Sequence, residues 1–129
     1  LSPSARRRVD RVREVIAAQP QIDHRMTAIA DMAATSPFHL ARLFKRHTGM
    51  TIRGYRLRLR LAAALERIAE GELDLAYLAA ELGFSHHSHL TSAFRRQFGV
   101  PPSVLRERLG AKRLLQNSTF LTASPARPS

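Results

Sequence analysis

The sequence contains no cysteine, which removes several kinds of chemistry at once. A chain without thiols forms no disulfide bond, iron–sulfur cluster or thiolate zinc site, and it offers no thiol nucleophile. Long apolar runs are also missing, because no stretch approaches the roughly 18 residues of a membrane helix. Residues 1–19 are amphipathic and rich in arginine, which does not fit a secretory signal. We therefore expect no membrane partner and a protein of the reducing cytoplasm.

Acidic residues are scarce: ten Asp and Glu stand against 21 Lys and Arg, and the formal net charge at pH 7 is +11. Residues 32–65 contain no acidic side chain at all. That stretch contains the cations Arg42, Lys45, Arg46, Arg53, Arg56, Arg58 and Arg60. Nineteen of the 21 cations in the chain are arginine, whose planar guanidinium binds phosphate or guanine through paired hydrogen bonds. A polyanion is therefore the expected partner.

One helix-turn-helix pattern occurs twice, with the second copy about fifty residues after the first. The first copy spans residues 26–49 and the second spans residues 74–99. Each copy has apolar residues at helical spacing, a turn containing serine, and a basic segment that ends at glycine. After the serine the second turn has one extra residue. Two short helices joined by a tight turn are typical of a unit whose second helix enters the major groove of DNA.

The apolar periodicity predicts an all-α fold of about seven helices, in which a long central helix joins the two helix-turn-helix units. This central helix, residues 52–70, would span ~28 Å at ~1.5 Å per residue. Such a length would hold the two units roughly one ~34 Å turn of DNA apart. We expect a single domain over residues 5–109 and a flexible tail over residues 110–129.

Capping residues mark where the other helices begin and end. The first helix is expected over residues 5–18, the second over residues 26–34 and the last over residues 102–109. Ser36 and Asp74 are in position to cap the helices that follow them. Gly83 is in position to make the second turn. No segment alternates as a strand would.

Beyond the repeat, the chain carries a dense set of motif residues: Ile29-Ala30, Ala33, Ser36-Pro37, His39-Leu40, Arg42-Leu43-Phe44-Lys45, Gly49-Met50-Thr51, Tyr55, Leu78-Ala79, Leu82-Gly83-Phe84-Ser85, His89-Leu90, Phe94-Arg95, Phe98-Gly99-Val100 and Pro102-Ser103. In these residues the segment 8–108 resembles the DNA-binding domain of the AraC/XylS family of bacterial transcription regulators. Three positions depart from the family: Ala34 replaces a common turn glycine, Thr35 an apolar residue, and Leu105 a tyrosine. We expect the first two changes to soften the first turn. The resemblance implies a nucleoid-associated protein that binds promoter DNA, most often to activate transcription by contacting RNA polymerase.

The second helix of each copy supplies the candidate base contacts. In the first copy, Phe38, Ala41 and Arg42 match base-contacting positions of the family. Phe38 and Ala41 would meet a thymine methyl group, and Arg42 would bind guanine O6 and N7. The alternative is that Phe38 packs beneath the preceding helix and that Arg42 is only solvated. In the second copy the resemblance implies contacts from His87, Ser88, Thr91 and Ser92.

Other polar residues are expected to bind phosphate, which positions a protein on DNA without reading its sequence. The candidates are Ser36, Lys45, Arg46, Arg53, Arg95 and Arg96. Four arginines alternate around the central helix: Arg53, Arg56, Arg58 and Arg60. We expect at least one of these four to face DNA and most to be solvated. Because the two reading helices belong to one chain and differ in sequence, we expect a monomer on a non-palindromic site of roughly 20 bp.

Two other functions stay open on the sequence. A non-specific architectural protein would share the basic charge but show little preference between DNA sequences. A metal-binding or small-molecule enzyme would use the cluster His86-His87-Ser88-His89, although this spacing offers two ligands at most on one side and zinc needs three or four. No catalytic triad, carboxylate pair or phosphate-binding glycine loop is recognisable, so we expect no catalytic residue, metal or cofactor. Full-length relatives often carry an N-terminal sensing and dimerising domain, and from the initial Leu1 we expect that one was left out.

Overall fold

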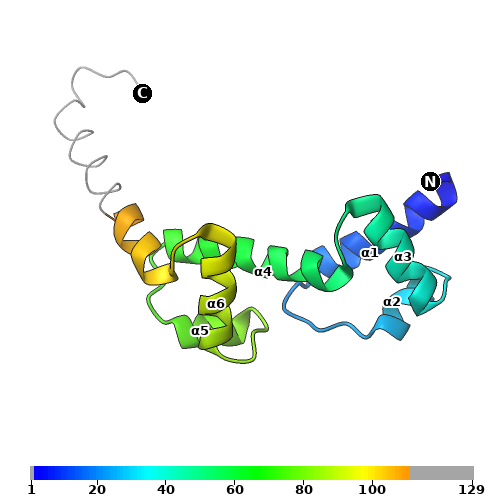
Figure 1. Ribbon diagram of the computed structural model, residues 1–129. Helices are drawn as coiled ribbons and strands as arrows, with labels where there is room; N and C mark the ends of the chain where they lie inside the picture. The colour runs from blue at the N-terminus through cyan, green and yellow to red at the C-terminus, as the bar shows by residue number, and fades with distance from the viewer. Residues whose placement is uncertain (1, 111–129) are drawn as a thin grey trace, which may run out of the picture.

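The computed structural model describes residues 2–110, and all regular structure within them is helical (Figure 1). The helices are α1 (Pro3–Ala18), α2 (Met26–Met32), α3 (Pro37–Thr48), α4 (Ile52–Ala69), α5 (Leu75–Glu81), α6 (His87–Phe98) and a seventh over residues 102–110. The predicted all-α class with about seven helices is confirmed. The tail expected over residues 110–129 lies outside the described residues, apart from residue 110 itself. None of the described helices is long and apolar enough to cross a membrane.

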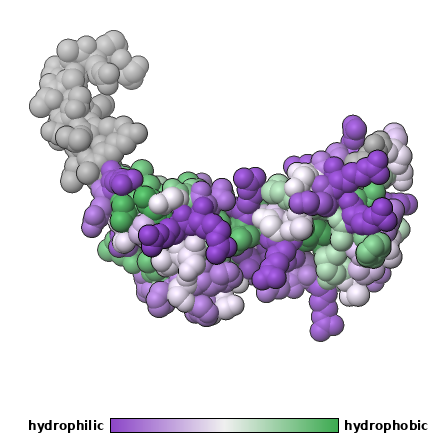
Figure 2. All heavy atoms as spheres, viewed as in Figure 1, coloured by the Kyte–Doolittle hydropathy of each residue, from purple (hydrophilic) through white to green (hydrophobic). Residues whose placement is uncertain are grey.

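Two helical units lie at opposite ends of α4 (Figure 1). In one, α1, α2 and α3 pack with the start of α4 around a core that includes Ile16, Ile29 and Phe44. In the other, α5 and α6 pack with the rest of α4 around a core that includes Leu78 and Phe94. Hydrophobic residues reach the face seen in Figure 2 only as separate patches among hydrophilic ones. Each helix-turn-helix therefore has its own core.

The central helix α4 belongs to both units. It has 18 residues, which corresponds to ~27 Å of length at ~1.5 Å per residue. Its first residue, Ile52, is buried in the first core, whereas Leu61 and Ile68 are buried in the second. Thr51 caps the helix, because its Oγ1 accepts a hydrogen bond from the N–H of Gly54 at 3.0 Å. The two units are thus mounted on one continuous helix.

Side-chain caps start the helices of the repeat. Ser36 Oγ accepts a hydrogen bond from the N–H of His39 at 3.1 Å, and Pro37 follows in the first turn of α3. Asp74 Oδ1 accepts from the N–H of Tyr77 at 3.0 Å at the start of α5. Both predicted caps are confirmed, and they fix which residues of α3 and α5 face the core.

Two helix boundaries differ from the sequence prediction by two residues, and the ends of α4 and of the last helix differ from it by one. α1 begins at Pro3 rather than at Ala5, because Ser2 Oγ accepts the N–H of Ala5 and thereby caps the helix earlier. α2 ends at Met32 rather than at Ala34, because Ala34 adopts a left-handed backbone conformation that a helix cannot contain.

The two turns share one geometry but not one residue type. Gly83 has a φ of +85° in the second turn, and Ala34 has a φ of +54° at the corresponding place in the first. An L residue in this region is strained by roughly 1–2 kcal/mol, whereas glycine is not. Four residues separate α2 from α3 and five separate α5 from α6, so the extra residue of the second turn is confirmed. The expected softening of the first turn corresponds to this strained alanine.

Candidate DNA interface

α3 turns an apolar face to the core and a basic face to solvent. Leu40, Leu43 and Phe44 are buried, as the helical spacing predicts. The exposed side carries Phe38, His39, Ala41, Arg42, Lys45 and Arg46. A shallow groove of about 520 Å³ runs along this side. The structure thus brings the three base candidates of the first unit onto one exposed surface with two of the phosphate candidates.

Phe38 and Arg42 form a stacked pair on this surface. The side chain of Phe38 is 73% exposed, which is unusual for a large apolar residue. The Arg42 guanidinium carbon lies 5.8 Å from the centroid of the Phe38 ring, within the range of a cation–π contact. The alternative in which Phe38 packs beneath the preceding helix is therefore wrong. The pair offers an apolar surface and a set of N–H donors side by side, as contacts to a thymine methyl group and to guanine require.

The candidate residues of α6 are smaller and partly engaged within the helix. His87, Ser88 and Ser92 are exposed, and Thr91 is half-buried. Thr91 Oγ1 donates a hydrogen bond to the carbonyl oxygen of His87 at 2.9 Å. Ser88 Oγ lies against Nδ1 of the preceding His86. The exposed surface of α6 is therefore less basic than that of α3, and two of its hydroxyl groups already have partners.

The histidine cluster begins α6. His86 Nδ1 accepts from the N–H of His89 at 3.3 Å, the capping role that Ser36 has in α3. The extra residue of the second turn moves this role from Ser85 to His86. The His89 ring packs edge-on against Phe84, with the ring centroids 5.2 Å apart. Within residues 2–110, no group of three His, Asp or Glu side chains is placed to hold a metal ion.

Arg60 is buried. The sequence predicts mostly solvated positions for the four arginines Arg53, Arg56, Arg58 and Arg60. Arg60 is 7% exposed and donates three hydrogen bonds. Nε donates to Pro20 O at 2.6 Å, Nη1 to Gly83 O at 3.0 Å, and Nη2 to Asp23 Oδ1 at 2.7 Å. Pro20 and Asp23 lie between α1 and α2, whereas Gly83 lies in the turn of the second unit. One side chain of α4 thus joins both units, because three fixed acceptors converge on its guanidinium.

The second turn packs directly on the first unit at the same place. A Cβ atom at Gly83 would lie 2.3 Å from Gln21 O and 3.0 Å from the Arg60 guanidinium carbon, so this close approach needs glycine. The hydrogen bond from Arg60 lowers the pKa of Asp23, and burial offsets only part of that effect. Asp23 is therefore charged at neutral pH. The placement of the two units depends on this contact as well as on α4.

The remaining arginines of α4 take different positions. Arg53 and Arg56 line a groove of about 540 Å³ between the two units, and Arg96 of α6 lines the same groove. The structure therefore brings together two phosphate candidates, Arg53 and Arg96, that lie far apart in the sequence. Arg58 is exposed, and its Nη1 lies 3.6 Å from the sulfur of Met50.

Comparisons with known proteins agree with this geometry. A family model described as a helix-turn-helix domain matches residues 29–108. The chain is 36% identical over 85 residues to the HTH-type transcriptional regulator GlxA of Rhizobium meliloti. The matched segment covers 66% of this chain and 26% of that protein. It is 38% identical over 80 residues to the HTH-type transcriptional activator RhaS of Escherichia fergusonii, covering 62% of this chain and 29% of that protein. The chain belongs to the AraC/XylS family.

Solved structures share the fold of this AraC-type domain. A transcriptional regulator from Chromobacterium violaceum, described as having an AraC-type DNA-binding domain, superposes with a TM-score of 0.74 at 23% identity. The superposition covers 84% of this chain and 96% of that one. The DNA-binding domain of AdpA in complex with a target DNA also gives a TM-score of 0.74, at 22% identity, over 81% and 95% of the two chains. The chain spans less than a third of the length of GlxA and RhaS.

An ion-pair network supports the second unit of the AraC-type domain. Arg67 of α4 lies 2.9 Å from Glu72 and 2.8 Å from Glu81, and its guanidinium also lies over the Tyr77 ring. The hydrogen bond from Arg67 lowers the pKa of Glu81. Leu105, where the family usually has tyrosine, packs against the second core. These contacts hold α5 and the last helix against α4 and leave the exposed face of α6 free.

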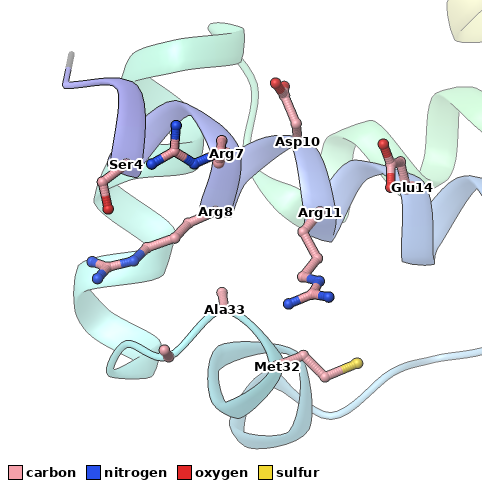
Figure 3. Close-up of a pocket in the computed structure, with 9 residues that line it drawn as sticks. Ser4, Arg7, Arg8, Asp10, Arg11, Glu14, Met32 and Ala33 are labelled. Carbon is pink, nitrogen blue, oxygen red and sulfur yellow. The ribbon is translucent and has the colours of Figure 1, made fainter.

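A hollow of about 550 Å³ lies between α1 and the end of α2, away from the reading faces of α3 and α6. Figure 3 shows Arg11 extending toward Met32, while Asp10 and Glu14 point to the other side of α1. The lining combines arginines with these two carboxylates, so its charge is mixed. It contains neither a nucleophile–base pair nor a buried polar group without a partner among the described residues. The hollow therefore adds nothing to the candidate interface.

Proposed function

We propose that this domain binds double-stranded promoter DNA as a monomer, with α3 and α6 in successive major grooves. The observation that carries the proposal is the exposed face of α3, where Phe38 and Arg42 stack beside Lys45 and Arg46. A monomer is favoured because one chain supplies two reading helices that differ in sequence, so a single copy contacts both half-sites. The similarity to the AdpA domain, whose structure contains a target DNA, supports the same docking mode.

The residues then divide by role. Base edges are contacted by Phe38, Ala41 and Arg42 of α3 and by His87, Ser88, Thr91 and Ser92 of α6. Phosphates are bound by Ser36, Lys45, Arg46, Arg53, Arg95 and Arg96. The stacked Arg42 is the strongest reader in this set, because a bidentate guanine contact discriminates by about 1–3 kcal/mol. The first half-site is therefore the stricter of the two.

Binding would activate transcription in the bacterial cytoplasm, at the nucleoid, through contact with RNA polymerase. Support for activation comes from RhaS, which is described as a transcriptional activator. The check is a reporter gene with the selected site upstream of its promoter. Expression should rise with the wild-type protein and stay at the basal level with Arg42→Ala. A fall below the basal level with the wild type would identify a repressor.

Selection of bound sites from random DNA tests the docking mode. Wild type should select a non-palindromic site of roughly 20 bp, and Arg42→Ala should lose the preference for one guanine in the first half-site. The matched variant Ser92→Ala removes at most one neutral hydrogen bond, worth about 1 kcal/mol, and should shift the second half-site only slightly. If Arg42→Ala keeps the wild-type preference, Arg42 does not read a base. A perfect inverted repeat bound by two chains contradicts the monomer, and equal affinity for selected and random DNA indicates an architectural protein.

A further inference from the structure

The groove between the two units is strongly basic. It has a volume of about 540 Å³ and is walled by the segment before α2, by α4 and by α6. Its lining includes four arginines, Arg53, Arg56, Arg60 and Arg96, and one acidic residue, Asp23. Asp23 forms an ion pair with Arg60 and also attracts Arg53 and Arg56, so one negative charge stands against four positive charges. The groove therefore has an excess of positive charge and is open to an anion.

Two buried nitrogen atoms in this groove have no hydrogen-bond partner. They are Nε of Arg56 and Nδ1 of His24. Among residues 2–110 these are the buried side-chain nitrogen and oxygen atoms that lack a hydrogen-bond partner. A buried donor without a partner costs roughly 1–3 kcal/mol, so such atoms usually serve a ligand or water. Burial lowers the pKa of Arg56, and repulsion by Arg60 lowers it further. An anion in the groove would supply the missing countercharge and, after a small turn of the Arg56 side chain, an acceptor for its Nε. Nδ1 of His24 donates to the same anion in the tautomer that carries its proton there.

The groove also lies between the two proposed reading helices. Arg53 is the second residue of α4, five residues after the end of α3. On α6, His89 and Arg96 are seven residues apart and lie on the same side as Ser92, a candidate base contact. When a duplex lies across α3 and α6, these helices enter two successive major grooves. The DNA segment between those two major grooves then lies against this groove of the protein. The anions in that segment are the phosphodiesters of the DNA backbone.

We propose that the groove between the two units is a phosphate-binding site for the DNA backbone between the half-sites, formed by Arg56 and His24 together with Arg53 and Arg96. The inference rests on the proposed docking of α3 and α6 and extends it, because Arg56 and His24 become backbone contacts. We assign Arg60 no phosphate contact, because three of its five N–H donors bind Pro20, Gly83 and Asp23 and hold the guanidinium in place. The hollow beside α1 has a similar volume, but its lining residues are three arginines together with Asp10 and Glu14, so the net charge around it is lower.

The first test compares two charge-neutralising variants on the same helix. Arg56→Gln removes a cation that lines the groove, and Arg58→Gln removes an exposed cation that does not. Affinity for the selected duplex is measured between low and moderate salt. Arg56→Gln should reduce the slope of log affinity against log salt by about 0.9, the value for one phosphate contact, and Arg58→Gln should change it by less than half of that. Thermal unfolding of both variants shows whether the fold is kept.

The second test neutralises the DNA. Methylphosphonates replace single phosphates, either between the half-sites or at the outer ends of the site. Central replacements should weaken binding of the wild type several-fold and leave Arg56→Gln almost unchanged, whereas outer replacements should weaken both proteins equally. Equal responses to the central replacements, or equal salt slopes for Arg56→Gln and Arg58→Gln, would overturn the groove assignment.

Two further outcomes separate the proposals from each other. If the wild type does not distinguish the selected duplex from a scrambled one, the proposed function fails, whatever the groove binds. If it does distinguish them and Arg56→Gln behaves like Arg58→Gln, only the groove assignment fails. A third outcome would assign the groove to a free anion and overturn the proposal. In that outcome inorganic phosphate stabilises the free wild-type protein but not Arg56→Gln, and the methylphosphonates have no effect on DNA binding.

Discussion

Replacing Arg60 with methionine tests whether one buried side chain holds the two units together. The substitution keeps much of the side-chain volume and removes the hydrogen bonds to Pro20 O, Gly83 O and Asp23 Oδ1. A hydrogen bond from a charged donor contributes about 1.5–3 kcal/mol net. The Asp23 side chain is 79% exposed and regains its partner from water, and groove water replaces part of the two carbonyl bonds. We therefore expect the free energy of unfolding to fall by about 2–4 kcal/mol.

Urea unfolding of four proteins measures this loss. The wild type and Arg60→Met are compared with Arg60→Lys, which keeps the charge but cannot reach three acceptors with one ammonium group. Arg58→Met is the matched control, because Arg58 is exposed and its loss should change the free energy of unfolding by less than about 0.5 kcal/mol. Arg60→Lys should fall between the wild type and Arg60→Met. A loss below about 1 kcal/mol in Arg60→Met would refute the reasoning, since it would mean that the three bonds contribute almost nothing net.

The same variant should also loosen the spacing of the DNA half-sites. Arg60 and Gly83 join the turn of the second unit to the first unit, so their contact restricts how α3 and α6 lie relative to each other. The wild type should lose at least tenfold in affinity when one base pair is inserted between the half-sites, and Arg60→Met should lose less. Both proteins are measured at a temperature at which the variant is folded. An equal loss in both would show that α4 alone sets the spacing.

Three other predictions follow from particular contacts. Ala34→Gly should raise the free energy of unfolding by about 1 kcal/mol, because it relieves the strain of an alanine at a φ of +54°. An unchanged thermal unfolding temperature would show that the turn is unstrained. Arg46→Ala should lower affinity equally for selected and random DNA and reduce the salt slope by about one, and a change confined to the selected site would make Arg46 a base reader. The pKa values of Asp23 and Glu81 are lowered in the folded state, so their stabilisation is present above the ordinary carboxyl pKa of about 4 and is lost as the pH falls through the folded values. The free energy of unfolding measured with urea should therefore fall below about pH 4, and it should fall less steeply in Asp23→Asn than in the wild type. If the ion pair between Asp23 and Arg60 is irrelevant, the two proteins should show the same fall.

Local signals made most of the fold predictable from the sequence. Ser36 sets the register of α3, and this register puts Leu40 and Phe44 inside and Phe38 outside. Gly83 and Gly49 stand where the chain takes positive φ values, and both positions follow from the repeat. Such signals lie within a few residues of the structure they specify, so the pattern alone is sufficient to read them.

The contacts between the units could not be predicted in this way. Arg60 is bonded to backbone carbonyl groups 40 and 23 residues away, and a carbonyl group carries no sequence signal. One sign was present: Arg60 is adjacent to Leu61 and four residues before Ala64, on the side of α4 that the apolar spacing assigns to the interior. The charge of Arg60 nevertheless favoured a solvated position, because buried arginines are rare unless they are paired. The groove was missed for the same reason, since its walls come from three separate elements.

The hydroxyl groups of α6 limit the base contacts that this proposed reading helix can make. Thr91 donates its hydroxyl hydrogen to the carbonyl oxygen of His87. Nδ1 of His86 faces the N–H of His89, and in the tautomer in which that nitrogen accepts, the Ser88 hydroxyl donates its hydrogen to the same nitrogen. Both side chains keep free lone pairs but have no free hydrogen. They can accept hydrogen bonds from a base and cannot donate to one.

The two half-sites should therefore differ in chemistry as well as in strictness. Arg42 offers only donors and suits guanine, whose major-groove edge presents acceptors. Thr91 and Ser88 offer acceptors and suit the amino groups of adenine and cytosine, which are the major-groove donors. Selected sites should then show guanine in the first half-site and adenine or cytosine opposite these hydroxyls in the second. Thr91→Val keeps the shape and removes one acceptor, so it should abolish the preference opposite Thr91 without changing the first half-site. Selection of thymine or guanine at those positions would mean that the hydroxyls leave their helix partners on binding, and the assignment of acceptors to α6 would be wrong.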